Sequence, residues 1–212
     1  MTTGSGRLFR RLYPMMAVAL LSACPARHTG PIRLDMSYTA GAALESIAPA
    51  ARGCAVRIDS IVDERINKQS LGQIGAGAES AGVSVVRKHP HSAVAIYGED
   101  IEGWVRRVFY DLGVLGYGLV EEGTESLPVV RLNVTLKHIY IRNVNSSLES
   151  VVRLTARYTR ADGVAEVRAY RGGHAKVNWA FGAEEIMAAL NHAMVGAIRD
   201  VARDLPELCG FS

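Results

Sequence analysis

The sequence lacks an apolar run long enough to span a membrane. The most apolar N-terminal stretch, Leu12–Leu21, is far shorter than the roughly 20 residues that a membrane-spanning helix needs. Gly-x-Ser-x-Gly and His-Glu-x-x-His are also missing, and these are the usual signatures of serine hydrolases and zinc peptidases. We therefore expect no permanent transmembrane helix and no enzyme activity.

An excess of charge of one sign is absent from most of the chain. The formal net charge is +3, but residues 1–23 hold three arginines and no acidic residue, which leaves 21 basic and 21 acidic side chains in the remainder. A formally neutral body lacks the broad basic field on which non-specific nucleic-acid binding depends. We expect no nucleic-acid partner. The 49% of apolar residues is typical of a folded domain with a core.

The first 24 residues follow the layout of a bacterial export signal. Arginines precede the apolar run, and small residues follow it,. Leu21-Ser22-Ala23-Cys24 closely resembles the lipobox of bacterial lipoproteins, in which the cysteine thiol receives a diacylglyceryl group and becomes the first mature residue. We predict that residues 1–23 are a lipoprotein signal peptide and that Cys24 is lipidated. The alternative is an ordinary secretory signal with an incidental cysteine.

Lipidation at Cys24 implies a location in the cell envelope. Two or more acyl chains anchor a protein stably to a bilayer, so a triacylated Cys24 predicts a membrane partner. Residues 24–53, rich in Pro, Gly and Ala, are interpreted as a lipidated N-terminus and tether, and the alternating piece Ile32–Tyr38 is expected to add an edge strand. Pro25 stands where lipoprotein families use Asp for inner-membrane retention. We therefore expect an outer-membrane protein that faces the periplasm.

Cysteine is scarce, with three residues in the whole chain. Export places Cys54 and Cys209 in an oxidising compartment, where an even pair is more often a disulfide than a metal or redox site. Their spacing is far from a Cys-x-x-Cys motif. We expect a bridge between them, which would stabilise the fold by about 3–5 kcal/mol in the chain-entropy picture. Two independent buried thiols are the alternative.

Hydrophobic periodicity predicts one α+β domain from residue 54 to residue 212. A period of two marks strands, and a period of 3.6 marks helices. The expected strands are Ala55–Val62, Val83–Arg87, Leu119–Val120, Val130–Tyr140, Val152–Thr159 and Ala165–Trp179. The expected helices are Asp100–Leu115 and Ile186–Leu205. This pattern predicts an antiparallel or mixed sheet of about five strands, with two helices packed on one face and a polar opposite face.

The alternation of apolar and polar residues in the long strands predicts which side chains face the helices and which reach the polar face. The alternation places an apolar set toward the helices: Val130, Leu132, Val134, Leu136 and Tyr140, then Val152, Leu154, Ala156 and Tyr158, then Ala165, Val167, Ala169, Ala175, Val177 and Trp179. Gly172-Gly173 is expected to form a bulge in the last strand.

The order of these segments is itself informative. It consists of the lipobox ending in Cys24, the strand and turn Val56–Arg65 followed by Leu71-Gly72, the helix Ile101–Leu115 with Gly116-Tyr117, the hairpin Val130–Tyr158 and the closing helix Glu184–Asp204. Over nearly the whole chain this order resembles the YajG-like family of bacterial lipoproteins. None of the segments is a catalytic motif. The resemblance implies a periplasm-facing lipoprotein without a defined biochemical role.

Other candidate chemistry is weak in this sequence. The glycine-rich stretch from Gly72 to Gly82 lacks the Lys and Ser/Thr of a phosphate-binding P-loop, so we interpret it as a surface loop. His89 and His91 have no further metal ligands nearby. Asp63 and Glu64 are expected to form a turn or an ion pair with Arg65 rather than an acid–base pair. We predict no catalytic, cofactor-binding or metal-binding residue, and no cofactor.

A basic set on the predicted polar face is the main candidate site. It consists of Arg131, Lys137, Arg153, Arg157 and Arg168. Gathered on neighbouring strands, these side chains would offer a basic surface to acidic lipid head groups, lipopolysaccharide or an acidic protein. Interleaved threonines and Glu166 favour the alternative of a merely solvated face, because charge is the default on the exposed side of an antiparallel sheet,.

The function predicted from the sequence is that of a membrane-anchored, non-catalytic binding or accessory subunit for another cell-envelope component, with an envelope protein as its expected partner. Its first alternative is a lipid or small-ligand carrier with a pocket between the helices and the sheet. A hydrolase is the third possibility.

Overall fold

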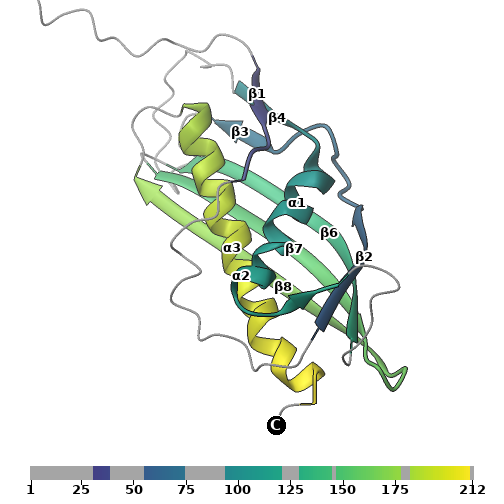
Figure 1. Ribbon diagram of the computed structural model, residues 1–212. Coiled ribbons are helices and arrows are strands. Elements are labelled where there is room, and N and C mark those ends of the chain that lie inside the picture. The colour runs from purple at the N-terminus through teal and green to yellow at the C-terminus, as the bar shows by residue number, and fades with distance from the viewer. Residues whose placement is uncertain are drawn as a thin grey trace, which may run out of the picture.

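An eight-stranded mixed sheet with helices on one face forms the body of the protein (Figure 1). The computed structural model describes residues 31–38, 55–74, 94–120, 129–144, 147–177 and 182–210. Cys24, Cys54, the strand predicted at Val83–Arg87, and His89 and His91 lie outside these residues. The strands are β1 (Ile32–Asp35), β2 (Ala55–Asp63), β3 (Gly72–Ile74), β4 (Val94–Glu99), β5 (Gly118–Leu119), β6 (Val129–Val144), β7 (Ser147–Thr159) and β8 (Ala165–Val177). The helices are α1 (Ile101–Phe109), α2 (Asp111–Val114) and α3 (Ala183–Leu208).

Strand β6 organises the sheet. Along one side it pairs antiparallel with β7, which pairs antiparallel with β8. Along its other side, the first half of β6 pairs parallel with β2 and the second half pairs parallel with β3. Strand β4 lies antiparallel to β3, β1 lies parallel to β4, and the two-residue β5 lies parallel to β2. The predicted mixed α+β sheet is confirmed, and so is the added strand near residue 32.

The expected number of about five strands is wrong, because the described sheet has eight. Strands β3 and β4 were not foreseen. β3 has three residues and begins at a glycine, and in β4 only Ile96 is buried. Neither segment is long enough to show a clear alternation. Gly72, interpreted as part of a surface loop, lies instead in the sheet, with φ +139° and its Cα so close to β6 that an added Cβ would stand 1.9 Å from the carbonyl oxygen of Ile141.

Helices α1 and α3 cover one face of the sheet and bury its core. The Asp100 side chain accepts a hydrogen bond from the Gly103 N–H and caps α1,. The indole Nε1 of Trp104 donates to Asn191 Oδ1 in α3 at 2.8 Å and ties the two helices together. The predicted helices are confirmed, with a break at Tyr110 between α1 and α2. Among the described residues, no helix is long and apolar enough to cross a membrane.

The register of β6 shifts between Leu136 and His138, which is a β-bulge at Lys137. An extra residue reverses the alternation beyond it. Before the bulge the even positions are buried, as predicted; after it Ile139 and Ile141 are buried, and Tyr140 is exposed. The prediction that Tyr140 faces the core is therefore wrong.

The predicted orientation of β8 is also wrong. Its alanines and valines at odd positions are exposed, whereas Tyr170 and Gly172 are buried against the helices. The pairing of Ala156 with Arg168 determines which residues of β8 face the helices. Directly paired residues share a face of the sheet, and Ala156 is buried,.

Gly172-Gly173 forms no bulge, since the β7–β8 register runs through both glycines without a shift. Gly172 instead lies directly under the backbone of α3. An apolar period of two predicts a strand, but it does not show which side of the strand is buried. In β8 the small apolar residues with this period are exposed, and the side that faces the helices carries mostly larger polar residues.

Candidate interaction face and the loop at its edge

The face of the sheet opposite α1 and α3 is covered by no described element (Figure 1). We call it the open face. Its side chains come from the outward positions of the three long strands and include Arg131, Asn133, Thr135, Lys137, His138, Tyr140, Arg153, Thr155, Arg157, Val167, Ala169 and Arg171. Antiparallel pairing across β6, β7 and β8 brings these residues into rows that cross the strands,.

Four members of the predicted basic set share the open face: Arg131, Lys137, Arg153 and Arg157. Arg168 does not join them, and this part of the prediction is wrong. It lies on the helix side of β8, where it contacts Glu166 and, in α3, Asp204 at 3.1 Å and Glu207 at 3.0 Å. The sequence reasoning instead missed Arg171, which lies directly opposite Arg153. Both arginines are placed correctly when the orientation of β8 is derived from its antiparallel pairing with β7.

The cations of the open face fall into two groups. Arg131 is ion-paired with Asp59 at 2.7 Å, and Lys137 is ion-paired with Glu64. Within the described part of the chain, Arg153, Arg157 and Arg171 are exposed and have no ion pair or side-chain hydrogen bond. The open face therefore carries three positive charges on β7 and β8 that no described carboxylate neutralises.

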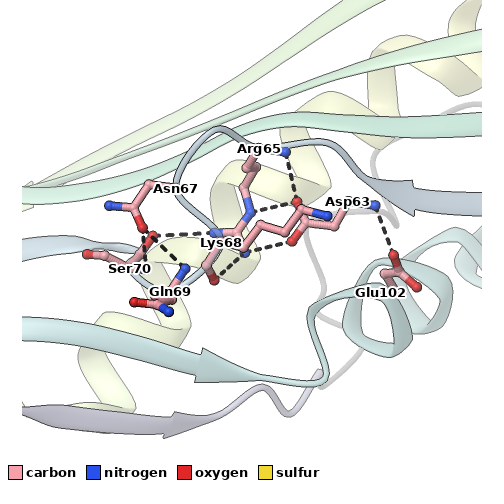
Figure 2. A network of polar contacts seen from close by, with 7 residues as sticks. All are labelled: Asp63, Arg65, Asn67, Lys68, Gln69, Ser70 and Glu102. Atoms are coloured by element: carbon pink, nitrogen blue, oxygen red, sulfur yellow. Dashed lines mark hydrogen bonds and ion pairs between the residues drawn. The ribbon is translucent and has the colours of Figure 1, made fainter.

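A tightly bonded loop, residues 63–70, borders the open face where β2 ends (Figure 2). Asp63 and Arg65 are both buried and form a bidentate pair, with Nε–Oδ1 2.9 Å and Nη2–Oδ2 2.8 Å. Arg65 also donates to the carbonyl oxygens of Lys68 and Ser70. From α1, Glu102 accepts a hydrogen bond from the Asp63 N–H at 2.9 Å. The expected ion pair between Asp63 and Arg65 is confirmed. It is buried, and with the other hydrogen bonds of Arg65 it joins the two ends of the loop.

The contacts with Arg65 change the pKa of Asp63. Burial by itself raises the pKa of the carboxyl group, but the hydrogen bonds and the positive charge of Arg65 outweigh burial and lower the pKa below its usual value,. Asp63 is therefore ionised near neutral pH and serves as a structural anion. Both of its carboxylate oxygens accept hydrogen bonds from Arg65, which fits a role in holding the loop.

The loop presents a hydrophobic side chain to solvent. Ile66 is fully exposed, with a relative accessibility of 106%, although the residues on either side of it hold the loop in place. Asn67 Oδ1 accepts hydrogen bonds from the N–H groups of Gln69 and Ser70. Beside Ile66 lies a cavity of about 480 Å³ lined by Arg65, Asn67, Ser70, Leu71, Gly72, Gln73, Lys137, His138, Ile139 and Tyr140. The hydrogen bonds hold the backbone of the loop, while the Ile66 side chain stands in solvent at the rim of this cavity.

His138 and Tyr140 form the wall of this cavity on β6. Their rings stack with centroids 6.0 Å apart. Burial, with the positive charges of Arg153 and Arg65 added, lowers the pKa of His138 below its usual value,. His138 is therefore neutral at neutral pH, and it lies beside Arg153 of β7.

A second cavity, of about 560 Å³, is lined by residues of α1, β2, β5 and β6. It is lined by Val56, Arg57, Ile58, Asp59, Arg106, Tyr110, Leu119, Val120 and Arg131. Its four charged side chains suit a polar ligand rather than an acyl chain.

The described residues include no group of three or more His, Cys, Asp and Glu side chains arranged to hold a metal ion. Cys209 is disulfide-bonded. Its predicted partner Cys54 lies outside the described residues, as does Cys24, so the Cys54–Cys209 pairing and the lipidation of Cys24 stay predictions.

The fold and the candidate site define a mixed α+β domain with one sheet face under helices and a cation-bearing face left open. No protein-family model and no curated protein matches the sequence. A solved Xanthomonas campestris protein assigned to the family model DUF330 aligns at a TM-score of 0.41 with 13% identity, covering 83% of this chain and 90% of that one. A minor lipoprotein from Acinetobacter baumannii aligns at 0.35 with 10% identity, covering 70% and 92%. These values assign neither family nor function, and the YajG-like resemblance stays a prediction.

Proposed function

We propose that this chain is a lipid-anchored cell-envelope protein without catalytic activity, which binds another envelope component through the open face and the loop 63–70. The observation that carries the proposal is the combination of open-face cations that no described carboxylate neutralises with a fully exposed Ile66 on a hydrogen-bonded loop at the border of that face. The lipobox-like Leu21–Cys24 supports the anchor. Outer-membrane sorting, suggested by Pro25, belongs to the same proposal.

The hydrogen bonds within loop 63–70 favour a binding role for the exposed Ile66 over exposure by chance. A mobile loop would lose conformational entropy when a partner bound it. Arg65, Asn67 and Glu102 already hold this loop in one shape, so Ile66 is presented with much of that cost removed.

Site-specific crosslinking in cells tests the proposal. A photoreactive residue replaces Ile66 in the full-length chain, and the matched control replaces Val114, which is 72% exposed in α2 away from the open face. We expect a discrete adduct with one envelope component from position 66 and none from position 114. The position-66 adduct should fall sharply in a Cys24→Ala variant, because the anchor concentrates the chain at its membrane. Equal labelling from both positions, or none from position 66, would contradict the proposal.

A further inference from the structure

Arg153 and Arg171 are direct cross-strand partners on the open face, at the middle of the β7–β8 pairing. Side chains at such positions have Cβ atoms about 4.5–5.5 Å apart, and like charges placed directly opposite each other destabilise a sheet. Neither arginine forms an ion pair with any other residue in the described ranges. The sheet thus holds two facing cations that no described carboxylate neutralises.

The surroundings leave room for an anion between these arginines. Gly173 follows Arg171 on the same face and has no side chain; a Cβ there would meet only the Ser150 carbonyl oxygen, at 3.8 Å. On the far side of Arg153 lies His138, its partner on β6. Positive charge from Arg153 contributes to the lowered pKa of His138, so the local potential is positive.

We propose that Arg153 and Arg171 together bind the phosphate group of an anionic lipid head group at the surface of the membrane to which the chain is anchored. The planar forks of two guanidinium groups match the oxygens of a phosphate. An anion placed between them removes their mutual repulsion. This inference rests on the proposed function for the anchor at Cys24.

The length of chain before β1 favours a lipid over an acidic protein. Cys24 lies eight residues before Ile32, the first residue of β1. A fully extended segment of this length reaches at most about 28 Å. A lipidated Cys24 therefore keeps the sheet close to the head groups, and a surface with small side chains such as Val167 and Ala169 around the arginines can lie against them.

Vesicle binding tests the site. Residues 24–212 include every described element, so this chain, carrying Cys24→Ala and no acyl group, is sedimented with vesicles of phosphatidylcholine alone or mixed with phosphatidylglycerol. We expect binding to the anionic vesicles only. Arg153→Gln and Arg171→Gln should each lower the affinity about five-fold. Arg203→Gln, an exposed arginine of α3 paired with Asp200, makes the same change in net charge and should have little effect.

A second measurement separates binding from misfolding. With no anion present, Arg171→Gln should raise the melting temperature, because it removes the repulsion from Arg153, while vesicle binding falls. Three results would overturn the inference: equal binding to neutral and anionic vesicles, an equal loss in Arg203→Gln, or stabilisation by inorganic phosphate with no vesicle binding, which would indicate a free-phosphate site. Since the tested chain carries no lipid, a failure of the Cys24 anchor does not affect any of these results.

Discussion

The carbonyl oxygen of Ala193 in α3 lies 1.6 Å from the position that a Cβ atom on Gly172 of β8 would occupy. The backbone of α3 therefore packs directly on the backbone of the sheet at this point. Gly196, one turn later in α3, also faces these glycines, and a Cβ there would stand 3.5 Å from the Gly172 Cα. This contact sets the height of α3 above β8 and fixes which side of β8 faces the core.

Gly172→Ala should destabilise the protein strongly, because backbone atoms on both sides must move to admit one methyl group. Overpacking of this kind costs about 1–3 kcal/mol, and more where backbone is the obstacle. Chemical denaturation followed by circular dichroism measures the change. The matched control is Gly173→Ala, whose Cβ would make only ordinary contact, and it should be nearly neutral. Equal effects at the two positions would mean that α3 does not sit on Gly172.

Because of the bulge at Lys137, substitutions at the neighbouring residues Tyr140 and Ile141 should reduce stability by very different amounts. Ile141 is fully buried, whereas Tyr140 is 37% exposed. Ile141→Asn should cost about 3 kcal/mol or more, because it removes apolar contacts and buries an amide. Tyr140→Asn should cost much less. Denaturation midpoints of the two variants decide the matter, and a larger loss for Tyr140→Asn would show that the alternation continues unbroken through Lys137.

The sequence predicted the long elements well for a physical reason. Strand β7 and helices α1 and α3 each bury a regularly spaced set of side chains, as does β6 on each side of its bulge, so hydrophobic periodicity predicts these elements directly. Strands β3 and β4 are short and held by neighbours remote in sequence: Gly72 pairs with Ile96 and with Ile141. No local pattern encodes such contacts.

The candidate site was predicted less completely, and one residue explains most of the difference. In β8 the exposed side carries small apolar residues, while the helix side carries Arg168, whose partners Asp204 and Glu207 lie in another element. The sequence does not distinguish a partly buried arginine whose counter-ions come from another element from an arginine on an open surface. The error placed Arg168 on the open face and hid Arg171, whose importance comes from its position opposite Arg153.

Arg168 should matter for stability and not for binding. Its side chain is only 20% exposed and contacts three carboxylates, and Tyr170 donates a further hydrogen bond to Asp204 at 2.7 Å. Arg168→Gln should lower the free energy of unfolding by about 2 kcal/mol, since it strips charged hydrogen bonds from a partly buried cluster. Arg157→Gln, at an exposed site, should change it by less than about 0.5 kcal/mol. Urea titrations compare the two variants, and similar losses would show that the cluster contributes no more than a solvated charge.

Asp63 predicts a specific pH dependence of stability. Because its pKa is lower in the folded protein than in the unfolded chain, its contribution is complete above the unfolded pKa of about 3.9 and is lost as the pH falls through the folded value. Asp63→Asn should reduce stability near neutral pH by about 3 kcal/mol, since Arg65 is left buried without its counter-ion. Below about pH 4 the difference between wild type and variant should shrink. Denaturant midpoints across this range test the sign, and a difference that grew on acidification would contradict it.

Lipid anchoring at Cys24 can be measured by intact mass spectrometry of the chain isolated from a membrane fraction. We expect the mature chain to begin at Cys24 and to carry added acyl mass, and a Cys24→Ala variant to carry none. The same sample should gain the mass of two hydrogens on reduction if Cys54 and Cys209 are joined. An unacylated chain in the membrane fraction, or a mature chain that begins at another residue, would contradict the anchor and with it the membrane location on which the lipid site depends.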